Sequence, residues 1–77
     1  MREVKPGGVY RHFKGKMYQV VDVAFHSETL EEYVVYRQLY GEEKTWVRPL
    51  AMFLEPVDRV KYPDCEQEFR FELTGEE

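Results

Sequence analysis

The sequence predicts a mostly β protein, a small SH3-like five-stranded barrel with one short helical turn near residues 49–53. Three observations support this class. Apolar residues alternate with a period of two far more often than they follow a helical stripe. The strand candidates are short and separated by tight turns. A closed barrel would also remove the sheet edges that five strands otherwise expose. An open, twisted antiparallel sheet packed on one helix is the alternative.

The first three strands follow from residue pattern and turn chemistry. Residues 9–13, VYRHF, are the first candidate, and Gly15 in the following FKGK tolerates a positive φ. Residues 17–25, MYQVVDVAF, are rich in the β-branched and aromatic side chains that favour strands. The polar stretch HSETLEE then interrupts the pattern, and residues 33–40, YVVYRQLY, predict the third strand.

The second half of the chain predicts two more strands and a helical turn. GEEK closes a hairpin into residues 45–48, TWVR, and Pro49 ends that strand because proline has no N–H to donate. Proline at a first helical position makes residues 49–53, PLAMF, suitable for a single helical or 3₁₀ turn. Residues 58–67 predict an irregular loop, and the alternation of residues 68–73, EFRFEL, predicts a half-buried last strand.

Length and composition limit the class of protein. Seventy-seven residues predict one domain over 1–77, with a core over about 8–73 and a frayed tail at 74–77. Cys65 is the only cysteine, so no intrachain disulfide forms, which fits a reducing compartment. The N-terminus lacks the apolar run of a secretory signal, and no stretch is long enough to span a bilayer. We therefore expect a cytoplasmic protein without a membrane span.

The net charge of −4 is unevenly distributed. Residues 1–20 carry five basic side chains and one acid, whereas residues 64–77 carry six acids and one base. A globally acidic protein is a poor general binder of nucleic acid, because neutralisation of phosphates supplies most of that affinity. A local basic and aromatic surface near the N-terminus is nevertheless compatible with single-stranded nucleic acid, and its candidate contacts are Arg11, Lys14 and Lys16.

Four separated segments resemble one family when they are considered together. They are YRHFKGKMYQVV, AFHSETLEEYVVYRQLYG, WVRPLAMFLE and a closing FRF, and they occur in order from about Gly8 to Phe71. This combination resembles the small bacterial proteins grouped as domain of unknown function 1653. The sequence departs from that pattern between Val57 and Phe69, where family members tend to have a shorter turn. The resemblance implies a small, single-domain, mostly β protein, and it lends no catalytic residues.

The polar stretch FHSETLEE has two interpretations. It is either a strand-connecting turn, in which Ser27 or Thr29 caps a backbone N–H and Thr29 forms a capping box with Glu32, or part of a ligand site. Catalysis by His26 with Ser27 is disfavoured, because neighbours on a strand point to opposite faces. We predict the turn, with His26, Ser27 and Thr29 available to a ligand.

Metal and cofactor chemistry have little support in the sequence. His12, His26 and Cys65 are the possible soft or imidazole ligands, but no pair has the spacing of a zinc site. No glycine-rich phosphate loop follows PGG at 6–8. The sequence therefore predicts no metal, no cofactor and no catalytic residue.

The segment TWVRP offers the strongest candidate for a binding site. Strand alternation places Trp46 and Arg48 on one face, where an indole and a guanidinium can hold a planar or anionic ligand. The alternative is a core tryptophan beside an arginine paired on the rim. One hairpin register places Arg37 opposite Arg48, which is costly unless an anion lies between them, and a shift of one residue brings Tyr36, Gln38 or Tyr40 to that face.

These observations favour a non-catalytic module that binds a nucleotide, RNA or small anionic ligand. Its predicted contacts are Trp46, Arg48, His26, Ser27, Thr29 and Arg37. A protein–protein interaction or accessory subunit is the alternative, suggested by six tyrosines and an acidic C-terminal third. A small enzyme acting on nucleotides, with His26 or His12 as proton carrier, has the least support.

Overall fold

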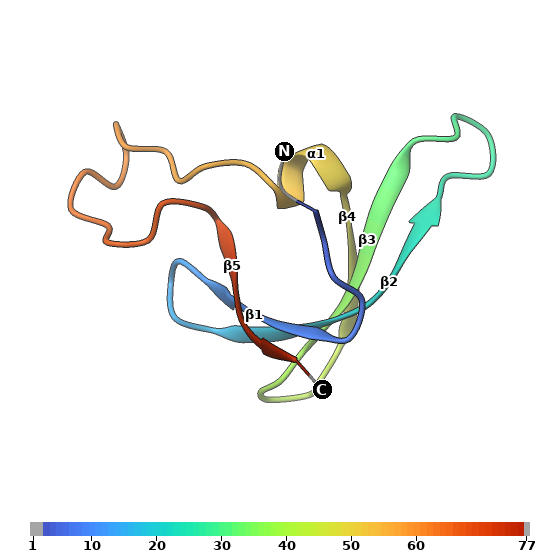
Figure 1. Cartoon of the computed structure of the whole chain (residues 1–77), viewed down its shortest axis with the longest axis horizontal. Coiled ribbons are helices and arrows are strands. Elements are labelled where there is room, and N and C mark those ends of the chain that lie inside the picture. Colours follow the sequence, from blue (N-terminus) through green and yellow to red (C-terminus); the bar gives the residue numbers. More distant parts are fainter. Residues whose placement is uncertain (1–2, 77) are drawn as a thin grey trace.

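The computed structural model describes residues 3–76, which form one curved antiparallel sheet and one short helix (Figure 1). The order of the strands in the sheet is β4-β3-β2-β1-β5. The elements are β1 (Gly8–His12), β2 (Met17–Phe25), β3 (Glu32–Gln38), β4 (Thr45–Pro49), α1 (Leu50–Phe53) and β5 (Phe71–Glu76). The mostly β class, the five strands and the short helix are therefore as the sequence predicts.

The sheet is open, so the predicted closed barrel is wrong. β4 and β5 lie at opposite ends of the sheet, and among residues 3–76 no ladder joins them. A barrel would need these two strands to pair, but α1 and the segment leading to β5 lie on that side of the sheet (Figure 1). The architecture corresponds to the alternative, an open antiparallel sheet packed on a helix, and an SH3-like arrangement is not confirmed.

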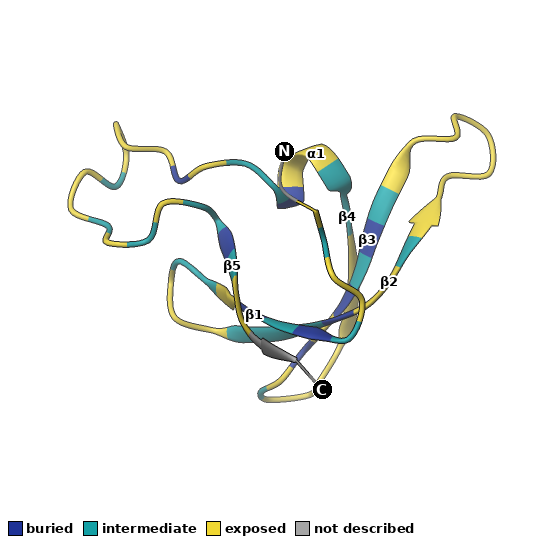
Figure 2. Ribbon diagram, viewed as in Figure 1, coloured by how far each residue is buried: buried dark blue, intermediate teal, exposed yellow. Residues whose placement is uncertain are grey.

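The core fills the concave face of the sheet. Its buried members are Tyr10, Val20, Val34, Tyr36, Phe53 and Phe71. The Phe53 side chain, 0% exposed, extends from α1 and stacks on Phe71 with ring centroids 4.2 Å apart. Edge-on contacts join it to Tyr10 and Tyr36 at 5.4 and 5.5 Å. These residues appear as the dark-blue parts of β1, β3, β5 and α1 in Figure 2. Aromatic rings thus supply most of the buried surface.

Local chemistry accounts for most element boundaries. β2 has the predicted bounds, and Gly15 adopts φ 100° in the turn that precedes it. β3 ends at Gln38 rather than at residue 40, and the following turn contains Gly41 with φ 57°. Pro49 is the N-cap of α1 instead of its first helical residue, with φ −52° and ψ 137°.

The last strand is shifted relative to the prediction of 68–73. Residues 55–57 and 68–70 pair with each other instead: Pro56 bridges Phe69, and the Arg70 amide donates to the Glu55 carbonyl at 2.9 Å. β5 therefore begins at Phe71, where pairing with β1 takes over. It continues through Glu76, so residues 74–76 belong to a strand rather than to the expected frayed tail, and Glu77 lies outside the described residues.

The segment 58–67 contains neither helix nor strand, as the sequence predicts, but hydrogen bonds fix its path. The Arg59 guanidinium donates to the carbonyls of Cys65 and Gln67. The Gln67 side-chain amide donates to the Arg11 carbonyl of β1 at 2.8 Å. These bonds hold the segment beside β1, so its side chains can contribute to a site at that end of the sheet.

Candidate anion-binding site

The β3–β4 hairpin has the register that places Tyr36 opposite Trp46. Arg48 consequently lies opposite Val34 on the concave face, whereas Arg37 lies opposite Thr45 and belongs to the other face. The pairing of Arg37 with Arg48 across an anion, one of the two registers considered from the sequence, does not occur. Trp46 and Arg48 do share a face, as strand alternation predicts.

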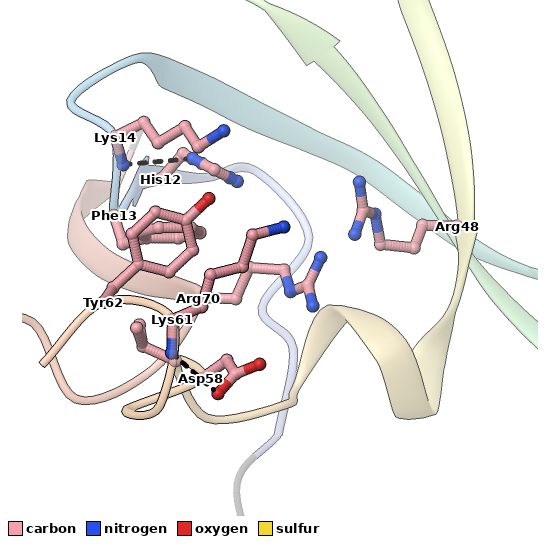
Figure 3. A pocket seen from close by; sticks show the side chains of 9 residues that line it. His12, Phe13, Lys14, Arg48, Asp58, Lys61, Tyr62 and Arg70 are labelled. Carbon is pink, nitrogen blue, oxygen red and sulfur yellow. Dashed lines mark hydrogen bonds between the residues drawn. The ribbon is translucent and has the colours of Figure 1, made fainter.

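A basic pocket of about 380 Å³ opens between β1, β4 and the segment 54–70. Its lining residues are His12, Phe13, Lys14, Arg48, Val57, Asp58, Lys61, Tyr62 and Arg70. In Figure 3 the Arg48 side chain reaches from β4 toward the side chains contributed by β1 and the segment leading to β5. We call this space the basic pocket, because its lining carries four cationic side chains and one carboxylate.

The negative groups near the basic pocket neutralise it only in part. The Asp58 carboxylate already accepts the amides of Val60 and Lys61 at 3.0 and 3.3 Å, which fixes it as a turn-capping group. The Arg70 guanidinium pairs with Glu55 at 3.5 Å, and the Arg70 Nε atom is buried without a hydrogen-bond partner. A buried N–H of this kind is costly unless a ligand or water accepts from it.

Burial and the neighbouring cations both lower the pKa of His12, which lines this pocket. The pKa of its imidazole falls from the ordinary 6.5 to about 4. Burial is the largest cause, followed by the positive charges of Arg48, Arg70 and Lys14. The Lys14 amide donates to His12 Nδ1 at 3.1 Å, so the neutral ring carries its proton on Nε2. At neutral pH His12 is therefore an uncharged hydrogen-bond donor surrounded by cations.

An aromatic pocket of about 220 Å³ adjoins the basic pocket along the concave face and shares Arg48 with it. Its other lining residues are Tyr18, Tyr36, Tyr40 and Trp46. The Trp46 indole donates to Gln38 Oε1 at 2.7 Å, and Arg48 Nε donates to the Tyr36 hydroxyl at 3.3 Å.

The phenols of Tyr18 and Tyr40 also meet in this pocket, with their oxygens 2.6 Å apart. Burial, followed by the hydrogen bond that it shares with Tyr40, raises the pKa of the Tyr18 phenol well above its ordinary value, so the Tyr18 hydroxyl is neutral at physiological pH. The aromatic pocket is therefore walled by fixed, uncharged rings.

The His26–Thr29 loop does not contribute to either pocket. The His26 Nδ1 atom accepts the amides of Glu28 and Thr29 at 3.1 and 3.3 Å, and Thr29 Oγ1 accepts the Glu31 amide at 3.2 Å. Leu30 takes φ 63° where the chain reverses. The side chains of His26 and Thr29 thus stabilise the turn between β2 and β3. Thr29 accepts from the amide of Glu31, and this bond takes the place of the predicted capping box with Glu32. His26 itself borders an apolar hollow with Tyr33 on the outer face.

The basic residues predicted to bind nucleic acid are divided among different surfaces. Lys14 lines the basic pocket, and its Nζ lies 5.7 Å from the Tyr62 ring centroid. Lys16 Nζ lies 4.7 Å from the ring centroid of Tyr40, one of the residues of the aromatic pocket. Arg11 borders a separate hollow whose other lining residues are Glu66, Gln67 and Glu72. Lys14 and Lys16 therefore remain near the concave face, whereas Arg11 is next to acids.

Sequence reasoning missed Lys61, Tyr62 and Arg70 of the basic pocket, and also Val57 and Asp58. Lys61 and Tyr62 lie in a segment without hydrophobic periodicity, so nothing local shows which way they face. Arg70 lies between two phenylalanines in a predicted strand, where alternation alone would direct it to solvent. The proximity of KY at 61–62 to RHFK at 11–14 arises only in the folded chain, where the Phe13 and Tyr62 rings lie 4.9 Å apart.

Residues 3–76 contain neither a cluster of metal-ligating side chains nor a membrane-spanning helix. Within this range no three His, Cys, Asp or Glu side chains gather closely enough to hold a metal ion. Cys65 is a free thiol. None of the helical residues described forms a segment of the length and apolarity required to cross a membrane.

The fold places the chain among small, mostly β proteins built on one curved antiparallel sheet, and in this chain the sheet carries a basic pocket beside a wall of aromatic rings. The chain belongs to the family described as protein of unknown function (DUF1653), whose model matches residues 8–73. The resemblance of the four sequence segments to this family is thereby confirmed.

A solved relative supports the same fold. The chain is similar to the crystal structure of a DUF1653 protein from Bordetella bronchiseptica, with 34% sequence identity and a TM-score of 0.80. The similarity covers 100% of this chain and 95% of the other. No curated protein matches the chain.

Proposed function

We propose that this protein is a non-catalytic binding module for a small anionic ligand that bears a phosphate or similar oxyanion. Nucleotides belong to that class, and RNA presents the same phosphate group. The ligand would bind in the basic pocket, between Arg48 on one side and Lys14, Lys61 and Arg70 on the other. The observation that carries the proposal is the pair of guanidiniums, Arg48 and Arg70, that line one pocket together with two lysines.

The chemistry of the lining groups fits an oxyanion. Guanidinium groups present planar, paired N–H donors that match phosphate and carboxylate geometry. His12 adds a neutral Nε2–H donor, and the Phe13 and Tyr62 rings form an apolar wall that lowers the local dielectric and so strengthens charge interactions. Because Asp58 is engaged by backbone amides, it does not need a lysine partner from the pocket. An anion would offset the mutual repulsion of the surrounding cations.

The test is a titration with inorganic phosphate, followed by two-dimensional amide NMR. We expect the largest shifts at residues 12–14, 48, 61–62 and 70. Arg48→Gln should weaken binding about tenfold or more, because a charge-assisted hydrogen bond is lost. Arg37→Gln is the matched control: it removes the same charge from the opposite face of the same hairpin and should leave affinity within about twofold. Equal weakening by both variants, or shifts confined to other residues, would reject the pocket.

A protein-binding surface is the second candidate, favoured by apolar side chains on the outer face. Phe25 and Val47 are 65% and 62% exposed and line one hollow with Tyr33 and Val35. Exposed groups of this kind often mark interfaces. If they bind a partner, Phe25→Ser should release that partner from a salt-resistant complex while phosphate binding stays unchanged. A complex that dissociates in high salt, or that persists in the Phe25→Ser variant, would exclude this surface.

A further inference from the structure

The two pockets of the concave face share one lining residue, Arg48, which therefore lies at their boundary. Trp46 and Arg48 are two residues apart on one face of β4, which separates their side chains by about 7 Å along the strand. A ligand with an anionic group in the basic pocket and a planar ring in the aromatic pocket would therefore contact both side chains at once. We propose that this ligand is a nucleotide unit, either free or within a single strand, and the inference rests on the proposed function.

Trp46 has the features of a stacking platform. Its side chain is 46% exposed, although it is the only tryptophan of a chain with a compact aromatic core. Its indole N–H is fixed by Gln38, whose own amide donates to the Tyr40 carbonyl at 3.1 Å. The ring plane is thus set before a ligand arrives, which lowers the ordering cost of stacking. A base of any identity can stack on such a ring.

Arg48 is held in the same way. Its Nε donates to the Tyr36 hydroxyl, and its guanidinium carbon lies 5.6 Å from the centroid of the Phe71 ring. Within the described part of the chain, no carboxylate lies within salt-bridge distance of Arg48. The guanidinium is therefore oriented by neutral groups at the boundary of the two pockets. A phosphate on one side and a base on the other are the two groups that a guanidinium binds well, by hydrogen bonding and by stacking.

A second cation lies beside the aromatic pocket. Lys16 Nζ is placed over the ring of Tyr40, which lines that pocket together with Trp46 and Arg48. A strand of two nucleotides with a 5′-phosphate has two phosphates, one of which would lie in the basic pocket and the other near Lys16. This arrangement distinguishes the two sources of the ligand. A single strand should gain affinity from Lys16, whereas a free mononucleotide should not.

The experiment compares four probes against the wild-type protein: adenosine 5′-monophosphate, ribose 5-phosphate, inorganic phosphate and a two-nucleotide RNA with a 5′-phosphate. Because Trp46 is the only tryptophan, its fluorescence reports stacking directly. We expect the mononucleotide to quench this fluorescence and to bind about tenfold tighter than ribose 5-phosphate, as stacking of one base would give. Ribose 5-phosphate should bind like inorganic phosphate and leave the fluorescence nearly unchanged.

Substitutions then assign the gain to the ring. Trp46→Leu should make the mononucleotide bind no better than ribose 5-phosphate, measured by calorimetry, while phosphate affinity stays unchanged. Trp46→Phe keeps a smaller ring, so it preserves the fold if the leucine variant does not and should retain part of the difference. Tyr33→Leu is the control, because it removes an aromatic ring from the outer face. It should leave the affinity difference between the mononucleotide and ribose 5-phosphate unchanged. Lys16→Gln should weaken only the two-nucleotide RNA if the ligand is a strand.

The outcomes separate this inference from the proposed function. If phosphate binds at the basic pocket but the mononucleotide binds no tighter than ribose 5-phosphate, the nucleotide inference is overturned and the anion site stands. If neither phosphate nor mononucleotide binds, the proposed function fails as well. If the mononucleotide binds with its full advantage to the Trp46→Leu variant, the base lies elsewhere and the geometry argued above is wrong.

Discussion

Acidification should destabilise this protein through one side chain, His12. The pKa of its imidazole is about 4 in the folded chain, against the ordinary 6.5 in the unfolded chain. Below about pH 6.5 the unfolded state therefore binds a proton that the folded state does not, and stability falls as the pH is lowered. The loss is complete only below about pH 4, where both states are protonated. Above about pH 6.5 neither state binds the proton, so the contribution of His12 no longer changes.

The size of the effect follows from the pKa difference. At 1.36 kcal/mol per pH unit, the upper bound is about 3 kcal/mol between pH 6.5 and pH 4. His12 is only partly buried, and water screens the cations around it, so about 1–2 kcal/mol is the expected loss. Against a total stability of about 4–12 kcal/mol for a chain of this length, such a change is measurable by urea denaturation.

Two measurements check this reasoning. The first is an NMR titration of the His12 ring protons, whose midpoint should fall well below the ordinary 6.5 and rise when phosphate binds. The second compares urea denaturation of the wild type and His12→Asn at several pH values. The asparagine keeps an acceptor for the Lys14 amide but does not titrate, so its stability should depend less on pH between about 4 and 6.5. A His12 midpoint at or above 6.5, or identical pH profiles, would refute the electrostatic account of the pocket.

Three further substitutions test the scaffold by urea denaturation. Phe53→Ala should cost about 3–5 kcal/mol, because a fully buried ring that joins α1 to the sheet is lost, and an effect under about 1 kcal/mol would contradict that role. Gly15→Ala should cost about 1–2 kcal/mol from backbone strain alone, because φ at Gly15 is 100° and an added Cβ meets nothing within 4 Å. An unchanged stability would contradict the positive φ of this turn. Gln38→Ala should cost about 1 kcal/mol and change the Trp46 emission, because the half-exposed indole N–H would donate to water instead of to Gln38. Unchanged emission would show that this hydrogen bond does not orient the ring.

The sequence was most informative where local chemistry alone decides the structure. β2 has its predicted bounds because alternating β-branched and aromatic residues end at turns on both sides. The helical turn after Pro49 follows from the geometry of proline. The closed barrel was wrong because closure depends on what fills the concave face, and the position of Phe53 there is a tertiary fact. β5 was shifted because residues 68–70 had a competing partner in 55–57.

The site was predictable in part for the same reason. Trp46 and Arg48 share a face by strand periodicity alone, so they could be selected without a structure. The sequence could not choose the hairpin register, and therefore could not exclude Arg37 from the site. The His26 turn contains the residue types of a binding loop, but those side chains are used by the backbone of the turn itself. Lys61 and Arg70 reach the basic pocket through the path of an irregular segment, which no periodicity encodes.

The position of β5 has a consequence for motion. β1 to β4 are joined by short connections, whereas β5 pairs only with β1, across a long separation in sequence that raises the entropy cost of closing the loop. We expect β5 to detach before the four-stranded meander unfolds, so its amides should exchange with deuterium sooner than those of β2 and β3. Since Arg70 and Phe71 leave with it, each such detachment would dismantle the binding surface while most of the sheet persists. A ligand bound to that surface should therefore slow amide exchange throughout β5, although most residues of β5 lie outside the surface.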